Sequence, residues 1–367
     1  MTTEEDKIIK LDSDTASEEQ SEEGGSCPDD SAFSDIDIND TPFSVFEYLR
    51  QLDRGKIVIQ PDFQRNQVWK AKQKSRFIES VLLDYPLPPI YLNETNEANY
   101  IVIDGLQRTT ALKEFYTGKL QLNKLKALEK FNGKFFKDLP EAIQSKFEDK
   151  KLTIFRLKPS TKMAVIYDLF ERINTGGTQL NRQEVRSCIF IGASTSLLKK
   201  LSEQTYFKNA IDNGVSSIRM KDREVILRYI AFRWFNYKEE YANMSDYIES
   251  VMKRINIMKN DEIQRIETDF EQVMTISLSI WGNANFRIPT KHTRGSVNIA
   301  VLETVCNYLS YKNNHFIEKN KNVIKSNYTQ LIKDPIYLDT VSRSTGTRTK
   351  VLDRFRLAHE ILNKNTI

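Results

Sequence analysis

The chain has 367 residues, which is enough for about two domains at roughly 150 residues each. Its three cysteines, Cys27, Cys188 and Cys306, lie far apart, which excludes a clustered metal site and a disulfide scaffold and favours a reducing cytoplasm. The sequence does not open on a basic segment followed by an apolar core, and no apolar run approaches the ~20 residues that cross a bilayer. We therefore expect a cytoplasmic protein without a secretory signal or a membrane span.

The charge is divided unevenly along the chain. Residues 1–40 carry fourteen acidic side chains and two lysines, for −12, so the other 327 residues carry 52 basic and 36 acidic side chains, for +16. A body with this surplus attracts polyanions, usually nucleic acid or nucleotides, although a lysine-rich solubilising surface is the alternative. The acidic segment has too few apolar residues to fold, so we expect a disordered tail that serves as a solubilising leader or a weak mimic of nucleic acid.

Taken in chain order, the predicted elements begin near Thr41. Residues 41–55 predict a helix with Thr41 as its N-cap and Pro42 at its first position, ended by Gly55. A short strand over 56–60, a helix over 72–84 and an extended run from Ile90 follow.

The clearest strand is "NYIVIDG", residues 99–105, because it is apolar on both faces and therefore belongs inside a sheet. A helix over 107–118, a strand over 151–157 and an amphipathic helix over 161–174 come next. Beyond about residue 180 only helical patterns appear, over 223–235, 244–258, 261–281, 297–310 and 350–362. The predicted fold class is α+β, with a small mixed domain over 41–180 followed by an all-helical domain over 181–367.

The most informative motif is "YIVIDGLQRTTALKEF", residues 100–115, in which a strand passes through Asp104 and Gly105 into a helix. The unpaired amides and the dipole of a helix start bind anions, and Gln107 and Arg108 add donors suited to phosphate oxygens. Asp104 could hold a metal ion or orient a water for attack on phosphorus. The alternative is that Asp104 and Arg108 form a structural ion pair.

Two other segments carry polar residues that a pocket could use. "PDFQRNQVW", residues 61–69, presents Gln64 and Arg65 on a proline-fixed turn, unless Arg65 is only a surface arginine beside two core aromatics. "FERINTGGTQLNRQEVR", residues 170–186, has paired glycines, Gly176 and Gly177, whose amides can converge on an anion. A glycine cap between two helices is the ordinary alternative there.

A basic stretch lies near the C-terminus, at "SRSTGTRTKVLDRFR", residues 342–356. Arg343, Arg348 and Lys350 surround a Ser/Thr/Gly turn and could contact the phosphate backbone of DNA. A solvated helix start with charged flanks explains the same residues equally well.

Taken in order, "PDFQRNQVW", "FIESVLLDYPLPPIYL", "IVIDGLQRTTAL" and "FERINTGGTQLNRQEVR" resemble the N-terminal domain of GmrSD-type (type IV) restriction enzymes, within the ParB/sulfiredoxin-like superfamily. The resemblance implies a site that binds and hydrolyses a nucleoside triphosphate (NTP) at an Asp-Gly-Gln-Gln-Arg motif. By position the motif falls on Asp104, Gly105, Leu106, Gln107 and Arg108. Leu106 replaces the first glutamine, which puts hydrolysis in doubt while leaving binding intact.

The same resemblance assigns nucleotide contacts to the flanking segments, at Gln64, Arg65, Gly105, Arg172, Asn174, Gly176 and Gly177. Relatives that cut DNA often carry an HNH nuclease domain downstream, and the three histidines of this chain do not form such a pattern. A "GxxxxGK" phosphate loop is also missing. DNA cleavage would therefore come from a nuclease subunit acting in trans or from the N-terminal domain itself.

These observations lead to the hypothesis of an NTP-binding and hydrolysing subunit of a DNA restriction system. Asp104, Gln107 and Arg108 would be catalytic, Asp104 would also hold Mg²⁺, and the basic helical domain would contact DNA. The competing hypotheses are a non-catalytic DNA-binding or regulatory module and a nuclease acting through Asp104. The sequence leaves open the identity of the NTP, the DNA modification and whether the chain forms a homodimer.

Overall fold

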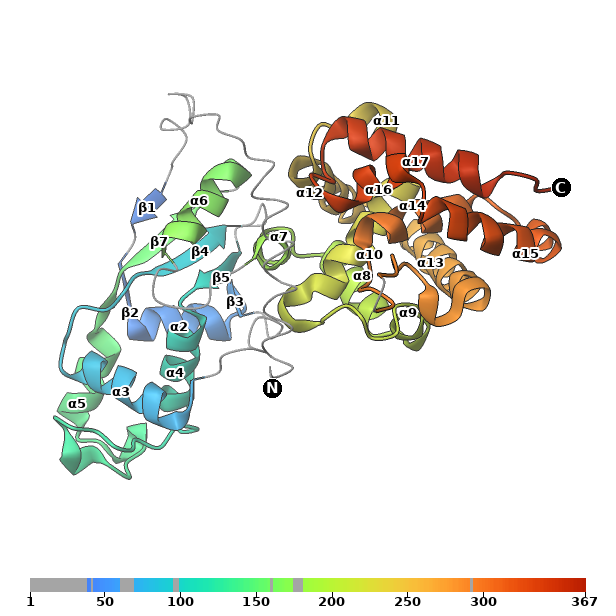
Figure 1. Ribbon diagram of the computed structural model, residues 1–367. Helices are drawn as coiled ribbons and strands as arrows, with labels where there is room; N and C mark the ends of the chain where they lie inside the picture. Colours follow the sequence, from blue (N-terminus) through green and yellow to red (C-terminus); the bar gives the residue numbers. More distant parts are fainter. Residues whose placement is uncertain are drawn as a thin grey trace. The chain divides into compact units, whose positions relative to one another are not determined.

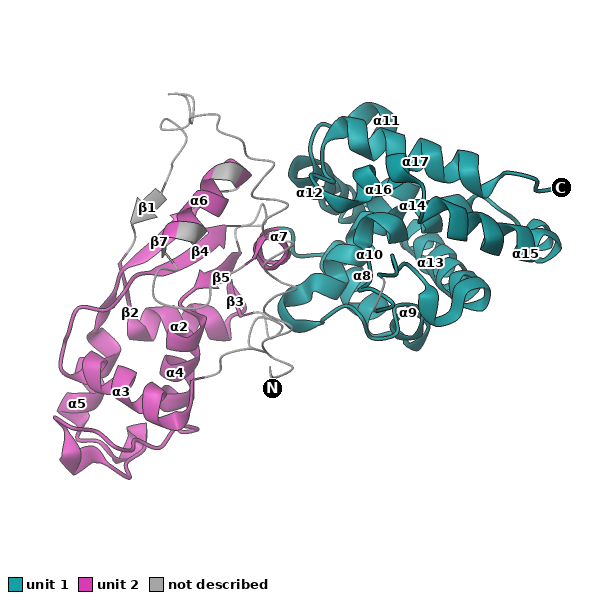
Figure 2. Cartoon of the chain, viewed as in Figure 1, with its two compact units in different colours: residues 1–27, 190–367 teal, residues 28–189 magenta. Residues whose placement is uncertain are grey.

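The computed structural model describes residues 38–40, 42–59, 69–94, 99–158, 161–173, 181–290 and 293–367. The chain divides into two compact units, Pro28–Ile189 and a second one that contains Phe190–Ile367 (Figure 2). The first unit is a mixed α+β domain and the second is helical, which confirms the predicted fold class (Figure 1). In the described part of the chain, no helix combines the length and the apolar character needed to span a bilayer.

The first unit is built on a five-stranded sheet with the order β1-β7-β4-β5-β3. Its strands are β1 (Ile38–Asp40), β3 (Ile57–Val58), β4 (Ile90–Glu94), β5 (Tyr100–Asp104) and β7 (Ile154–Leu157). β4 runs parallel to β7 and antiparallel to β5, and β3 pairs with β5 in parallel. The disordered tail was predicted to extend to residue 40, and this boundary is wrong, because Ile38–Asp40 form a strand that pairs antiparallel with β7. Residues 1–37 lie outside the described part.

A second sheet, of two strands, includes residues that were predicted to begin the first helix. β2 (Phe43–Ser44) pairs with β6 (Lys151–Leu152), so helix α2 (Val45–Asp53) begins only after Ser44. The Ser44 hydroxyl accepts a hydrogen bond from the amide of Glu47 at 3.1 Å and is the true N-cap. The helix start predicted after Thr41 is therefore wrong, and Thr41 itself lies outside the described residues. The strand predicted over 151–157 is likewise split into β6 and β7.

Helices cover both faces of the five-stranded sheet. They are α2, α3 (Ala71–Leu82), α4 (Leu106–Tyr116), α5 (Glu141–Asp149), α6 (Met163–Ile173) and α7 (Arg182–Ile189), with short 3-10 turns η3 (Glu129–Phe131) and η4 (Phe136–Asp138). Val102 of β5 belongs to the core formed with α2 to α5, whereas its neighbour Ile103 belongs to a smaller core with α6 and α7. β5 is therefore buried on both faces, as its sequence predicts.

The second unit consists of helices joined by short connections. They are α8 (Ala193–Ser202), α9 (Thr205–Ala210), η5 (Ile218–Met220), α10 (Lys221–Trp234), α11 (Tyr237–Glu240), α12 (Met244–Ile255), α13 (Asn260–Trp281), η6 (Gly282–Ala284), α14 (Ile299–Ser310), α15 (Asn314–Leu331), α16 (Pro335–Ser342) and α17 (Arg348–Leu362). The predicted helices correspond to α10, α12, α13, α14 and α17. Helix α15 was not predicted, because its mostly polar sequence obscures the buried residues at helical spacing, such as Ile317, Ile324 and Leu331.

A buried charge network joins three of these helices. Glu303 on α14 is fully buried and accepts hydrogen bonds from Arg228 on α10 and from Arg354 on α17, the latter at 2.7 Å. Arg354 is itself fully buried and also donates to the carbonyl oxygen of Thr345. Because charges removed from water need partners, this carboxylate fixes the positions of α10, α14 and α17.

We predict that Glu303→Ala lowers the free energy of unfolding of the helical unit by about 3 kcal/mol or more, because it removes the only carboxylate bonded to the buried Arg354 guanidinium among the described residues. The matched control is Glu360→Ala, which removes an exposed partner of Arg356 on α17 and should leave stability nearly unchanged. Urea unfolding followed by circular dichroism measures both. Equal effects of the two substitutions would contradict a structural role for the buried network.

Candidate functional site

The junction between β5 and α4 is set by Gly105. Its φ of +97° is left-handed, and a Cβ built there would lie 2.9 Å from Cγ1 of Ile90. Glycine is therefore required by both backbone conformation and space. The amide of Thr109 donates to the carbonyl oxygen of Gly105 at 2.8 Å, so the amides of residues 106–108 precede the first hydrogen bond within the helix. Such amides form the anion-binding end of a helix.

Asp104 and Arg108 form an ion pair across this junction, between Oδ2 and Nη2. The side chain of Asp104 is 28% exposed and that of Arg108 is 13% exposed, so an incoming ligand would meet the carboxylate first. Nε of Arg108 is buried and has no hydrogen-bond partner in the described part of the chain. The ion pair considered from the sequence is thus formed, and the guanidinium keeps a donor that no described acceptor uses.

Tyr91 belongs to the same site, although no sequence motif predicts it. It lies opposite Asp104 in the register of β4 and β5, and its ring packs against Phe155 with 5.2 Å between centroids. Partial burial raises the pKa of the Tyr91 hydroxyl, the Asp104 carboxylate raises it further, and Arg108 acts in the opposite direction. Tyr91 is therefore a neutral hydroxyl beside the ion pair. Only the strand register identifies this residue.

Gln107 connects two of the sequence motifs. Its Oε1 accepts a hydrogen bond from the backbone amide of Trp69 at 3.0 Å. Trp69 is the last residue of "PDFQRNQVW", and its indole ring packs 5.6 Å from the ring of Phe77 on α3. The end of this motif therefore lies at the start of α4. Its two predicted nucleotide contacts, Gln64 and Arg65, fall outside the residues that the structure describes.

The third motif, residues 170–186, contains the end of α6 and the start of α7. These two helices share a core with Ile103 of β5 through Ile166 and Val185. Arg172 near the end of α6 is exposed, and its Nε donates to Asp168 at 2.9 Å. Within the described residues it has no contact with Asp104 or Arg108. The predicted contacts Asn174, Gly176 and Gly177 lie in the part of the chain that is not described.

The residues predicted to bind DNA lie in the helical unit, where most of them have internal partners. Arg348 donates to the carbonyl oxygens of Tyr241 and Lys238, the latter at 2.7 Å. Lys350 donates to the carbonyl oxygen of Arg343 at 2.9 Å and pairs with Asp339 at 3.2 Å. Arg343 is exposed. Arg348 is exposed as well, and DNA contact by these three residues stays a prediction.

The model of the GmrSD restriction endonuclease, N-terminal domain, matches residues 45–191, from α2 to just beyond α7. Residues 45–191 belong to this domain family. The family resemblance expected from the four motifs is thereby confirmed. No match was found among curated proteins. The GmrSD N-terminal domain contains the β5–α4 junction, Tyr91, Trp69 and Arg172, and it indicates a component of a restriction or defence system.

We predict that Gly105→Ala destabilises the GmrSD N-terminal domain by roughly 3 kcal/mol, because left-handed strain of about 1–2 kcal/mol adds to the clash with Ile90. The matched control is Gly118→Ala at the end of α4. Gly118 is also left-handed, at φ +72°, but a Cβ there would meet nothing within 4 Å. Thermal unfolding should show the larger loss for Gly105→Ala. Equal losses would mean that close approach to Ile90 does not constrain the junction.

Proposed function

We propose that the GmrSD N-terminal domain binds an NTP at the start of α4 and hydrolyses it, as part of a DNA restriction or defence system. The observation that carries this proposal is the partly exposed Asp104–Arg108 pair at the left-handed Gly105 junction. It places a carboxylate, a guanidinium and the first amides of a helix within one turn. The surplus of positive charge over residues 41–367 supports a polyanionic partner such as DNA.

The proposed role of each group follows from its chemistry. Arg108 and the first amides of α4 bind phosphate oxygens, because a guanidinium offers paired donors and a helix start offers a positive dipole. Binding exchanges the Asp104–Arg108 ion pair for a contact between Arg108 and phosphate. Gln107, held by the amide of Trp69, keeps its NH₂ group as a donor for the ligand or for an attacking water. Gln64, Arg65, Arg172, Asn174, Gly176 and Gly177 stay predicted contacts of the nucleotide.

Asp104 is the candidate ligand for Mg²⁺. Within the described ranges, three or more His, Cys, Asp or Glu side chains nowhere gather closely enough to hold a metal ion. One carboxylate still fits, since Mg²⁺ is commonly held by one or two carboxylates together with substrate phosphates. When bound it would neutralise phosphate charge. The carboxylate of Asp104, released from Arg108, would orient the attacking water or the ion.

The first test is nucleotide binding by the full chain, measured by thermal shift and by phosphate release with each NTP and Mg²⁺. We expect one NTP to raise the unfolding temperature and to be hydrolysed. Arg108→Ala should weaken binding at least tenfold, because it removes the guanidinium that replaces water at the phosphate. Arg76→Ala is the matched control, since Arg76 is an exposed arginine on α3 of the same unit. No shift and no phosphate release with any NTP would exclude the enzymatic proposal.

A second variant separates a functional ion pair from a structural one. Asp104→Asn keeps the size of the side chain and removes its charge, so it frees Arg108 from its internal partner. We expect it to abolish Mg²⁺-dependent phosphate release and to retain or strengthen nucleotide binding in the absence of Mg²⁺. A purely structural pair would instead make Asp104→Asn and Arg108→Ala similar losses of stability, with hydrolysis per folded molecule unchanged.

Replacing Leu106 is predicted to increase hydrolysis. This residue occupies the position of the first glutamine in the motif that the resemblance implies, and its side chain is partly buried against the core. If that amide serves hydrolysis, Leu106→Gln should raise the rate of phosphate release several-fold at a small cost in stability. The measurement is the steady-state rate at saturating NTP. An unchanged or lower rate would show that Leu106 is not what limits hydrolysis.

The direct ion pair also favours a second candidate function, a DNA-binding or regulatory module without catalysis. In that case Asp104 and Arg108 stabilise the junction, and the basic surface carries the activity. DNA binding would then weaken steeply with salt and would not respond to nucleotide. Titrations of labelled duplex DNA at several salt concentrations, with and without NTP, decide between the two. A nucleotide-dependent affinity would contradict the second candidate.

A further inference from the structure

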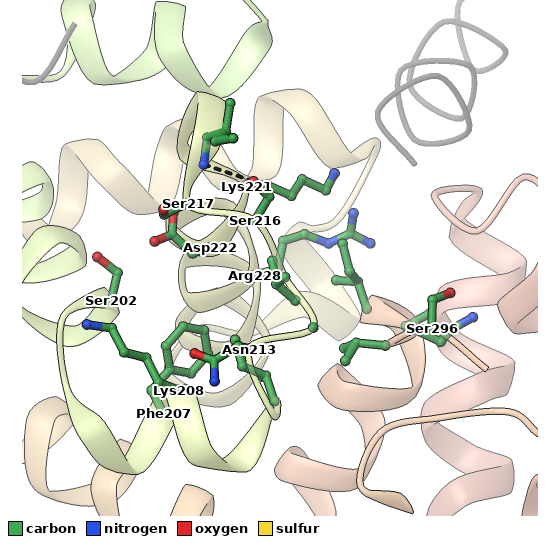
Figure 3. A pocket seen from close by; sticks show the side chains of 18 of the residues that line it. Ser202, Phe207, Lys208, Asn213, Ser216, Ser217, Lys221, Asp222, Arg228 and Ser296 are labelled. Atoms are coloured by element: carbon green, nitrogen blue, oxygen red, sulfur yellow. Dashed lines mark hydrogen bonds between the residues drawn. The ribbon is translucent and has the colours of Figure 1, made fainter. Parts of the chain in front are cut away.

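The helical unit contains a cavity of about 670 Å³ that no sequence motif predicted (Figure 3). It lies among the segment that follows α9, the start of α10 and the start of α14. Its volume falls within the range of small-molecule sites, roughly 300–1,000 Å³. Its apolar lining includes Phe207, Ile211, Val297, Ile299 and Val341, and its polar lining includes Ser216, Ser217, Asn298, Lys208, Lys221 and Arg228.

Two cations that line this cavity, Lys221 and Arg228, belong to a network of ion pairs. Lys221 pairs with Glu224 at 3.0 Å, and Glu224 lies 3.6 Å from Arg228. Arg228 bonds to Glu303, which in turn binds Arg354 at 2.7 Å. These five side chains comprise three cations and two carboxylates. Lys221 and Arg228 line the cavity, whereas Glu224 and Glu303 are not among its lining residues.

The acidic residue that does line the cavity is set apart from these cations. This residue is Asp222, which Figure 3 draws apart from the ends of the Lys221 and Arg228 side chains. Its Oδ1 accepts a hydrogen bond from the amide of Arg223 at 2.8 Å. Lys221 and Arg228 are therefore the cationic part of the lining that α10 contributes.

The N-terminal ends of two helices add partial positive charge to the same cavity wall. α10 begins at Lys221 and α14 begins at Ile299, directly after its cap Asn298, and all three residues line the cavity. The positive ends of both helix dipoles are thus at the cavity wall, where they favour an anion. The aliphatic side chains of the lining favour an apolar body on the same ligand.

We propose that this cavity binds a small organic phosphate, with its phosphate group at Lys221 and Arg228 and its apolar body against Ile211, Val297 and Ile299. This site is separate from the proposed nucleotide site, because every lining residue lies within Phe190–Ile367. A phosphate there would bind two cations whose bonded carboxylates, Glu224 and Glu303, do not line the cavity. The apolar body distinguishes the ligand from inorganic phosphate.

The test uses three probes on the full chain in isothermal titration calorimetry. Phenyl phosphate carries both the anion and an apolar ring, inorganic phosphate carries the anion alone, and phenol carries the ring alone. We expect phenyl phosphate to bind at least tenfold more tightly than either of the other two. Equal affinity for inorganic phosphate or for phenol would overturn the proposed ligand class, and no binding of phenyl phosphate would overturn the site.

Variants locate the binding. Lys221→Met keeps the aliphatic stem and should weaken phenyl phosphate at least fivefold, whereas Lys319→Met, at an exposed lysine of α15, should not change the affinity. Ile218 lines the cavity and is 42% exposed, so it allows a matched pair of substitutions of opposite charge. Ile218→Lys should strengthen binding and Ile218→Glu should weaken it.

The Ile218 pair decides the proposal even if Lys221→Met does not fold, because both substitutions place a long charged side chain at the same exposed position and differ chiefly in the sign of its charge. Affinities that change in opposite directions support an anion in this cavity. Affinities that stay equal, or that change in the same direction in both variants, overturn it.

Discussion

The positive φ of Gly105 is the constraint on which the candidate site depends. It lets β5 turn directly into α4, so that Asp104 at the end of the strand and Arg108 in the first turn of the helix come within bonding distance. β5 contributes to cores on both of its faces, and its end is held in place on each side. Residues attached to such an end keep a fixed geometry, which any phosphate site requires.

The two units handle charge differently, and burial explains the difference. In the GmrSD N-terminal domain the Asp104–Arg108 pair is partly exposed, so water eases its separation and a ligand can compete for either partner. In the helical unit Glu303 and Arg354 are fully buried, so separating them leaves an uncompensated charge away from water. The first arrangement suits exchange with a ligand. The second suits a rigid wall that presents Lys221 and Arg228.

Local features of the sequence were enough to predict β5, α3, α4 and the helical character of the second unit. They failed where partners are distant in sequence: the pairing of β2 with β6 displaces the first helix start to Ser44, and Tyr91 joins the site only through strand register. The spacing of Asp104 and Arg108 permits an ion pair but cannot say whether one forms. The cavity of the helical unit was not predictable, because its lining is drawn from separate segments between Ser202 and Thr345.

The central claim is that Arg108 leaves Asp104 to bind phosphate at the start of α4. A crystal structure of the full chain with Mg²⁺ and a non-hydrolysable analogue of the bound NTP tests it most directly. The proposal predicts a phosphate oxygen on the Arg108 guanidinium and on an amide of residues 106–108, with Arg108 and Asp104 no longer bonded. An intact Asp104–Arg108 pair, with the analogue bound elsewhere, would contradict it.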